Sequence, residues 1–139
     1  MILVKMEQTT TEPKNILIID DNQSIGKLLS RFLDLKGIDH TEVTNGQNGL
    51  TLIRQKKFDA ILLDVTMPKF SGFDVVDSLE KEGRLKDENI FMFTASSITQ
   101  SEEDDLIKRG VRGCIKKPIR INELLTIIGA NNEKTDESI

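Results

Sequence analysis

The sequence of 139 residues has no tryptophan, no tyrosine and a single cysteine, Cys114. One cysteine excludes an internal disulfide and a cysteine-rich metal site, and suits a reducing compartment. No apolar stretch approaches the length that spans a bilayer. A net charge of −4 with dispersed lysines and arginines offers little electrostatic surface for nucleic acid. We therefore expect a cytoplasmic protein that binds neither membranes nor nucleic acid.

The composition fits one globular domain, because 37% of the residues are hydrophobic and 30% are charged. Both ends of the chain are polar, although the first four residues, Met1 to Val4, are apolar. We expect residues 1–14 and 130–139 to form solvated tails on either side of a domain at residues 15–129.

Short apolar runs alternate with segments of helical periodicity along this domain. Three runs are bounded by polar residues and are too short for helices, so they predict buried central strands at 16–19, 60–63 and 90–93. Two weaker strands are predicted at 38–43, whose mixed polarity suits a sheet edge, and at 111–115.

Apolar residues at helical spacing predict five helices, around residues 25–32, 50–53, 73–79, 106–107 and 121–128. The resulting order is five βα units. Right-handed crossovers between parallel strands predict an α/β fold with a doubly wound parallel sheet. In such sheets ligands bind beyond the carboxyl ends of the strands.

Polar side chains occupy the positions where the predicted strands end. Asp20 and Asp21 follow the first strand, Asp64 the third and Thr94 the fourth, while Lys117 lies just beyond the fifth. In a parallel sheet these positions meet at one edge, so we expect three carboxylates, a hydroxyl and an ammonium in one crevice.

Three carboxylates in one pocket raise one another's pKa unless a cation shares the site. An all-oxygen cluster suits Mg²⁺, with Mn²⁺ as a possible substitute. A carboxylate beside such a metal can attack phosphorus, while the metal and a lysine neutralise charge on the transferring group. We predict Asp64 as the nucleophile, Lys117 as the counter-charge and Thr94 as a hydrogen-bond donor to the phosphoryl group.

Each residue alone also has a structural explanation. The Asp20-Asp21 pair is of the type that caps a helix, Asp64 could initiate a turn, Thr94 could be an N-cap and Lys117 could be a solvated charge. Their joint appearance at successive strand ends is what favours a functional site.

The chain resembles the receiver domain of two-component response regulators over the whole expected domain. The resemblance rests on Ile-Leu-Ile-Ile-Asp-Asp-Asn at 16–22, Asn45-Gly46, Leu-Leu-Asp-Val-Thr-Met-Pro at 62–68, Ser71-Gly72, Thr94-Ala95-Ser96 and Lys117-Pro118. It implies a flavodoxin-like (βα)5 fold with five helices and the strand order 2-1-3-4-5.

The resemblance also implies the roles of the site residues. A histidine kinase or a phosphotransfer protein would phosphorylate Asp64. Asp21 would bind Mg²⁺ directly, Asp20 mainly through a water, and the backbone carbonyl of Thr66 would complete the protein ligands beside Asp64. Thr94 and Lys117 would contact the phosphoryl group, and the Lys117–Pro118 bond is expected to be cis.

Two further positions carry family expectations. Thr66 and Ser96 lie where receivers tune the lifetime of the phosphoryl group. Cys114 occupies the position where the family usually has a switch tyrosine or phenylalanine, so the usual aromatic relay is missing. We interpret Cys114 as a small, half-buried hydrophobe, with a redox-sensing thiol as the alternative.

Two other functions remain as alternatives. A haloacid-dehalogenase-like phosphatase also uses a strand-end aspartate, but it needs a second acid two residues later, where this chain has Thr66 or Asn22. A degenerate receiver would act as a binding module without phosphorylation. Slow self-phosphorylation from small donors is expected of a receiver that is not otherwise an enzyme.

Only about ten residues follow the last predicted helix, so we expect a stand-alone receiver that signals through protein contact. The fourth helix, the fifth strand and the fifth helix form the usual output surface of the family. We expect a monomer or a phosphorylation-dependent dimer.

Overall fold

The computed structural model describes residues 14–95 and 98–129. A five-stranded parallel sheet lies at its centre, with the strand order β2-β1-β3-β4-β5. The strands are β1 (Asn15–Ile19), β2 (Asp39–Val43), β3 (Ala60–Asp64), β4 (Ile90–Thr94) and β5 (Gly113–Lys116). The flavodoxin-like α/β fold and the strand order are both confirmed.

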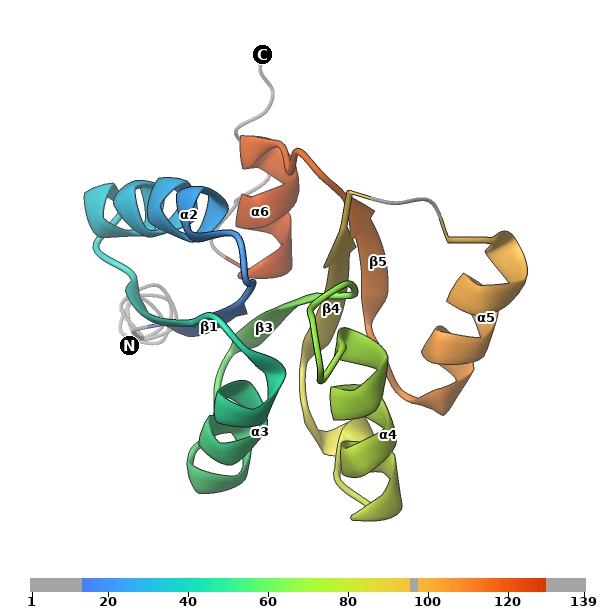
Figure 1. Cartoon of the computed structure of the whole chain (residues 1–139). Helices are drawn as coiled ribbons and strands as arrows, with labels where there is room; N and C mark the ends of the chain where they lie inside the picture. Colours follow the sequence, from blue (N-terminus) through green and yellow to red (C-terminus); the bar gives the residue numbers. More distant parts are fainter. Residues whose placement is uncertain (1–13, 96–97, 130–139) are drawn as a thin grey trace, which may run out of the picture.

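Within the described residues, five α-helices cover the sheet, and their order along the chain follows the predicted βα units. They are α2 (Gln23–Leu35), α3 (Gly46–Gln55), α4 (Gly72–Lys81), α5 (Gln100–Arg109) and α6 (Ile121–Ile127), with a short 3₁₀ helix η1 (Leu85–Asp87) before β4. Helices α2 and α6 lie on one face of the sheet, α3 and α4 lie on the other, and α5 lies beside β5 (Figure 1).

Alternating strand residues divide the core into two layers. In β1, Leu17 and Ile19 pack with the residues of α3 and α4, whereas Ile16 and Ile18 pack with those of α2 and α6. Because both faces are covered, the central strands are continuous apolar runs. Each fully buried isoleucine or leucine stabilises the fold by about 1.5–3 kcal/mol relative to an exposed one.

Two strands begin later than predicted, for one common reason. Gly37 and Gly110 have positive φ values of 71° and 133° and end the preceding helices. The residue after each glycine then donates its backbone N–H to the preceding helix. Ile38 donates to Leu33 O, and Val111 donates to Leu106 O. These residues close helices α2 and α5, as in a Schellman-type ending, so they cannot join the strand ladder. The predicted strands at 38–43 and 111–115 therefore start at Asp39 and Gly113.

The expected tails, 1–14 and 130–139, lie outside the described residues apart from Lys14. None of the helices in the described ranges has the length and apolar character that a membrane crossing requires.

Candidate functional site

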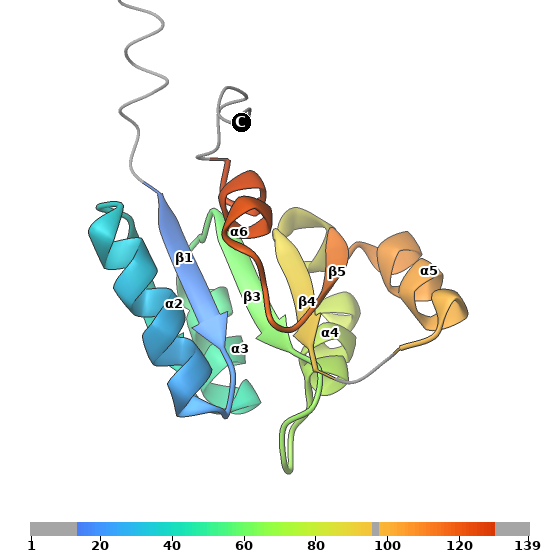
Figure 2. The ribbon, with the colours of Figure 1, turned by 90° about the horizontal axis from the view of Figure 1, so that it is seen from above.

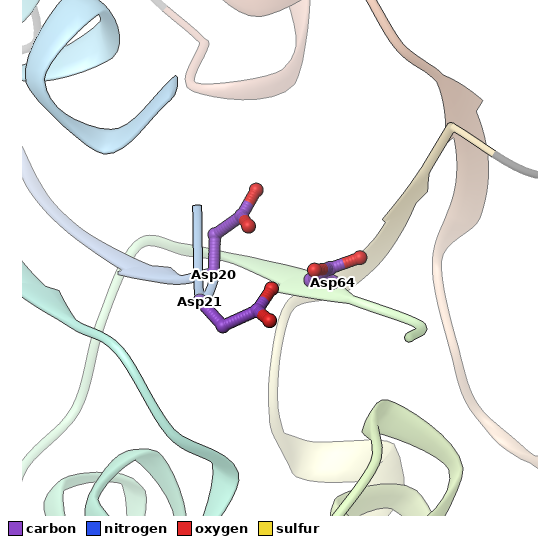
Figure 3. Close-up of side chains that lie close together, drawn as sticks. All are labelled: Asp20, Asp21 and Asp64. Atoms are coloured by element: carbon purple, nitrogen blue, oxygen red, sulfur yellow. The ribbon is translucent and has the colours of Figure 1, made fainter. Parts of the chain in front are cut away.

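The three predicted carboxylates meet at the carboxyl edge of the sheet. Asp20 and Asp21 follow β1 directly, and Asp64 is the last residue of the neighbouring strand β3. One carboxylate oxygen from each residue lies within 4.8 Å of the others. Figure 3 shows the three side chains gathered around a common space, with Asp20 and Asp64 buried and Asp21 exposed.

Asp64 sits in an unfavourable electrostatic environment for a charged carboxylate. Only 4% of the surface of Asp64 is exposed. Burial, followed by repulsion from Asp20, raises the pKa of Asp64 from 3.8 to about 7, while Lys117 and the Thr66 N–H act in the opposite direction. The Thr66 N–H donates to Asp64 Oδ1 at 3.2 Å. Added positive charge would therefore stabilise the ionised form of Asp64.

Lys117 supplies the positive charge in the described part of this pocket. Its Nζ lies 2.7 Å from Asp20 Oδ2 and 3.6 Å from Asp64 Oδ1. The same ammonium lies 4.9 Å from the centre of the Phe93 ring, which adds a cation–π contact. The prediction that Lys117 is the counter-charge of Asp64 is thus refined, because its shorter contact is with Asp20. The Lys117–Pro118 peptide bond is cis, as expected.

Helix capping does not explain these residues. Asn22, not Asp20 or Asp21, caps α2 by accepting from the N–H groups of Ser24 and Ile25. The cap of α5 is Thr99, five residues beyond Thr94. Asp20 does contribute locally, since its Oδ1 accepts from the Asn22 N–H at 2.9 Å, but its other oxygen faces Lys117.

Sequence reasoning did not identify why Gly72 is needed at this site. A Cβ on Gly72 would lie 2.3 Å from the backbone oxygen of Asp64, so only glycine lets α4 begin against the end of β3. A Cβ on Gly46 would similarly lie 2.7 Å from Phe70 O, in the loop after β3. The Asn45-Gly46 and Ser71-Gly72 pairs were the only signals of this close backbone approach.

The donor chemistry fits a hard divalent cation. Three carboxylates face one ammonium, all the candidate donors are oxygens, and the exposed Asp21 leaves the cluster open to solvent. Asp20, Asp21 and Asp64 could therefore hold Mg²⁺. Thr66 follows at the rim with an exposed side chain.

The remaining predicted residues lie beside the acidic cluster. Thr94 is the buried last residue of β4 and pairs in register with Lys116. Ser96 lies outside the described residues. Cys114, on β5, is half-buried, and burial followed by repulsion from Glu103 raises its pKa to about 11. This environment supports a small hydrophobe and disfavours a redox-sensing thiol.

Comparisons with known proteins agree with this geometry. Residues 16–129 match the family model described as the response regulator receiver domain. The chain is 33% identical over 121 residues to the DNA-binding dual master transcriptional regulator RpaA of Synechocystis sp., covering 87% of this chain but only 50% of RpaA. It therefore spans half of that relative. It is 30% identical to the protein PilH of Pseudomonas aeruginosa, covering 83% of this chain and 94% of PilH.

A solved structure gives a similar result. A response regulator protein of Burkholderia pseudomallei, with a phosphorylated aspartic acid, a calcium ion and citrate, superposes with a TM-score of 0.71. The two sequences are 25% identical, and the match covers 83% of this chain and 66% of that one.

Proposed function

The chain belongs to the response regulator receiver family, and we propose that it accepts a phosphoryl group on Asp64. Receivers are signalling modules that interact with histidine kinases or phosphotransfer proteins and with downstream targets. The observation that carries the proposal is the Asp20, Asp21 and Asp64 cluster with Lys117 in contact with two of its members.

In the proposed step, a carboxylate oxygen of Asp64 forms a bond to phosphorus as the bond between phosphorus and the donor's imidazole nitrogen breaks. The bonding electrons leave with the imidazole. Mg²⁺ or Mn²⁺, held by Asp20, Asp21, Asp64 and the Thr66 carbonyl, would neutralise charge on the transferring group. The Lys117 ammonium then pairs with the phosphoryl oxygens instead of with Asp20. The Thr94 hydroxyl donates a hydrogen bond to one of these phosphoryl oxygens.

Lifetime control follows from positions beside the nucleophile. The Thr66 side chain is exposed two residues after Asp64. In the sequence, Ser96 likewise follows Thr94 by two residues. We propose that these two residues set the decay rate, and that small phosphodonors slowly phosphorylate the protein without a kinase.

For output, we propose protein contact through α5, β5 and α6, by a cytoplasmic stand-alone receiver built on residues 15–129. Not all basic residues of this region are available to a partner. Arg109 binds Asp77, Glu80 and Asp105, which ties α5 to α4. Lys108, Lys116 and Arg120 are exposed and suit an acidic partner surface.

A degenerate receiver is the second candidate, and Cys114 is the feature that favours it. Cys114 and Thr94 line a cavity of about 50 Å³ together with Ile98 and Glu103. A cysteine side chain leaves this space beside Thr94 unfilled. In this alternative the fold binds a partner without using phosphorylation.

The deciding experiment follows the intact mass of the protein incubated with acetyl phosphate, with Mg²⁺ or with a chelator. One phosphoryl addition that needs both Mg²⁺ and Asp64 is expected. Asp64→Asn should prevent it, whereas the matched variant Asp104→Asn, on the exposed surface of α5, should not. A folded protein that is never phosphorylated would support the degenerate receiver, and steady release of phosphate at enzymatic rates would support a phosphatase.

A further inference from the structure

An apolar groove lies between α2 and α6, beside the acidic site. It has a volume of about 450 Å³, and its apolar lining includes Ile25, Leu28, Ile119, Ile121 and Leu124. Leu28 and Ile121 leave 65% and 51% of their surface exposed within the described part of the chain. Lys117, which contacts Asp20, also lines the groove. One end of the groove therefore lies next to the carboxylates of the acidic site.

The apolar surface continues along α2. Leu35 lies seven residues after Leu28, which places both on the same side of the helix, and it is 82% exposed. Helix α2 runs antiparallel to β1, so its end lies near the start of that strand (Figure 2). The apolar stripe therefore leads from the groove to the end of the molecule where the chain enters the sheet at Lys14.

The sequence before Lys14 contains a segment of suitable chemistry. Five of the first six residues are apolar, namely Met1, Ile2, Leu3, Val4 and Met6, and residues 7–13 connect them to Lys14 through six polar residues and Pro13. Seven extended residues span up to about 25 Å. Helix α2, with 13 residues, is about 20 Å long. The polar stretch is thus long enough to carry the apolar segment along α2 to the groove.

We propose that residues 1–6 dock into the α2–α6 groove of the same molecule and cover Leu28 and Ile121. This inference does not depend on phosphorylation of Asp64. Because one end of the groove is at Lys117, the docked segment would lie beside the acidic site. Any protein that binds this face would have to displace the segment.

The first test compares amide chemical shifts of the full chain and of a variant with Leu3→Asp and Val4→Asp. We expect shift changes at the amides that line the groove, because the charged side chains will not stay in it. The matched control, Gln8→Asp with Thr9→Asp, adds the same charge within the polar stretch and should leave those amides unchanged. Equal effects of both variants, or none from either, would overturn the proposal.

The second test distinguishes this segment from a second copy of the chain. In a Cys114→Ser background, Leu3→Cys is combined with Leu28→Cys or with Lys27→Cys, which lies on the same helix but about 100° further round. We expect an intramolecular disulfide to form several-fold faster with Leu28→Cys, at a rate independent of protein concentration. Disulfide-linked dimers alone would assign the groove to a second copy, and equal rates for the two pairs would contradict docking.

Discussion

Two ends of the same sheet bury carboxylates in different ways. At the carboxyl end, Asp64 is 4% exposed and shares its pocket with Asp20, Asp21 and Lys117. At the amino end, Glu88 is 3% exposed, and its Oε1 accepts no hydrogen bond from the described residues. The nearest ammonium, that of the exposed Lys57, lies 3.9 Å away.

Burial raises the pKa of both acids, so this property does not separate a functional site from a structural one. The separation comes from convergence. Asp64 stands among residues from three strand ends, whereas Glu88 belongs to no group of three or more potential metal ligands in the described ranges. A buried acid becomes a candidate for chemistry when other groups of matched type surround it.

The largest expected difference between the two ends of the sheet is the effect of each buried acid on phosphorylation. Asp64→Asn is expected to abolish phosphoryl addition from acetyl phosphate, because an uncharged amide replaces the nucleophilic carboxylate. Glu88→Gln should be phosphorylated like the wild type. If both variants lost the reaction while remaining folded, the difference between the two ends would disappear.

The half-buried thiol of Cys114 extends the comparison to a third acid with a raised pKa. With its pKa raised to about 11, the thiolate is rare at pH 8. Alkylation by iodoacetamide should be on the order of a hundredfold slower in the folded protein than in the unfolded chain. Rates measured with and without denaturant provide the check, and similar rates would restore the redox-sensing hypothesis.

Two glycines test how closely each end is packed. Gly72→Ala should lower the free energy of unfolding by about 2–3 kcal/mol, because the new Cβ would clash with the backbone of Asp64. Gly83→Ala, after α4, meets no atom within 4 Å but has a φ of 73°, so about 1 kcal/mol is expected. Denaturant unfolding measures both, and Gly72→Ala should also slow phosphorylation whereas Gly83→Ala should not.

Proton binding should change the stability by no more than the clash at Gly72→Ala. The raised pKa of Asp64 means that the fold favours its protonated form, so this contribution to stability is complete below about pH 3.8 and is lost as pH rises through about 7. In metal-free buffer, Asp64→Asn should therefore be more stable than the wild type above pH 7, by about 2 kcal/mol, with the difference shrinking toward pH 4.

Stabilisation by Mg²⁺ should depend on Asp64 and not on Glu88. At ten times its Kd, Mg²⁺ should stabilise the wild type by about 1.4 kcal/mol at pH 8. Glu88→Gln should retain that gain and Asp64→Asn should lose most of it. Unfolding curves with Mg²⁺ and with a chelator make the comparison, and an equal Mg²⁺ response in all three proteins would place the ion elsewhere.

Much of this molecule could be predicted from local sequence. Continuous apolar runs with polar boundaries identify β1, β3 and β4, and the mixed polarity of residues 39–43 identifies the edge strand β2. The first residues of β2 and β5 were harder to predict. Ile38 and Val111 are apolar and β-branched, as strand residues often are, but their N–H groups donate to the preceding helices. Periodicity does not reveal such helix-ending bonds.

The sequence by itself determined which residues reach the carboxyl edge, since strand ends in a parallel sheet converge whatever the detailed packing. Only the tertiary structure decided that Lys117 approaches Asp20 more closely than Asp64, that Gly72 touches the end of β3, and that Glu88 is buried without a comparable cluster. These outcomes depend on differences of about an ångström, which are set by the packing of helices on the sheet rather than by any pattern along the chain.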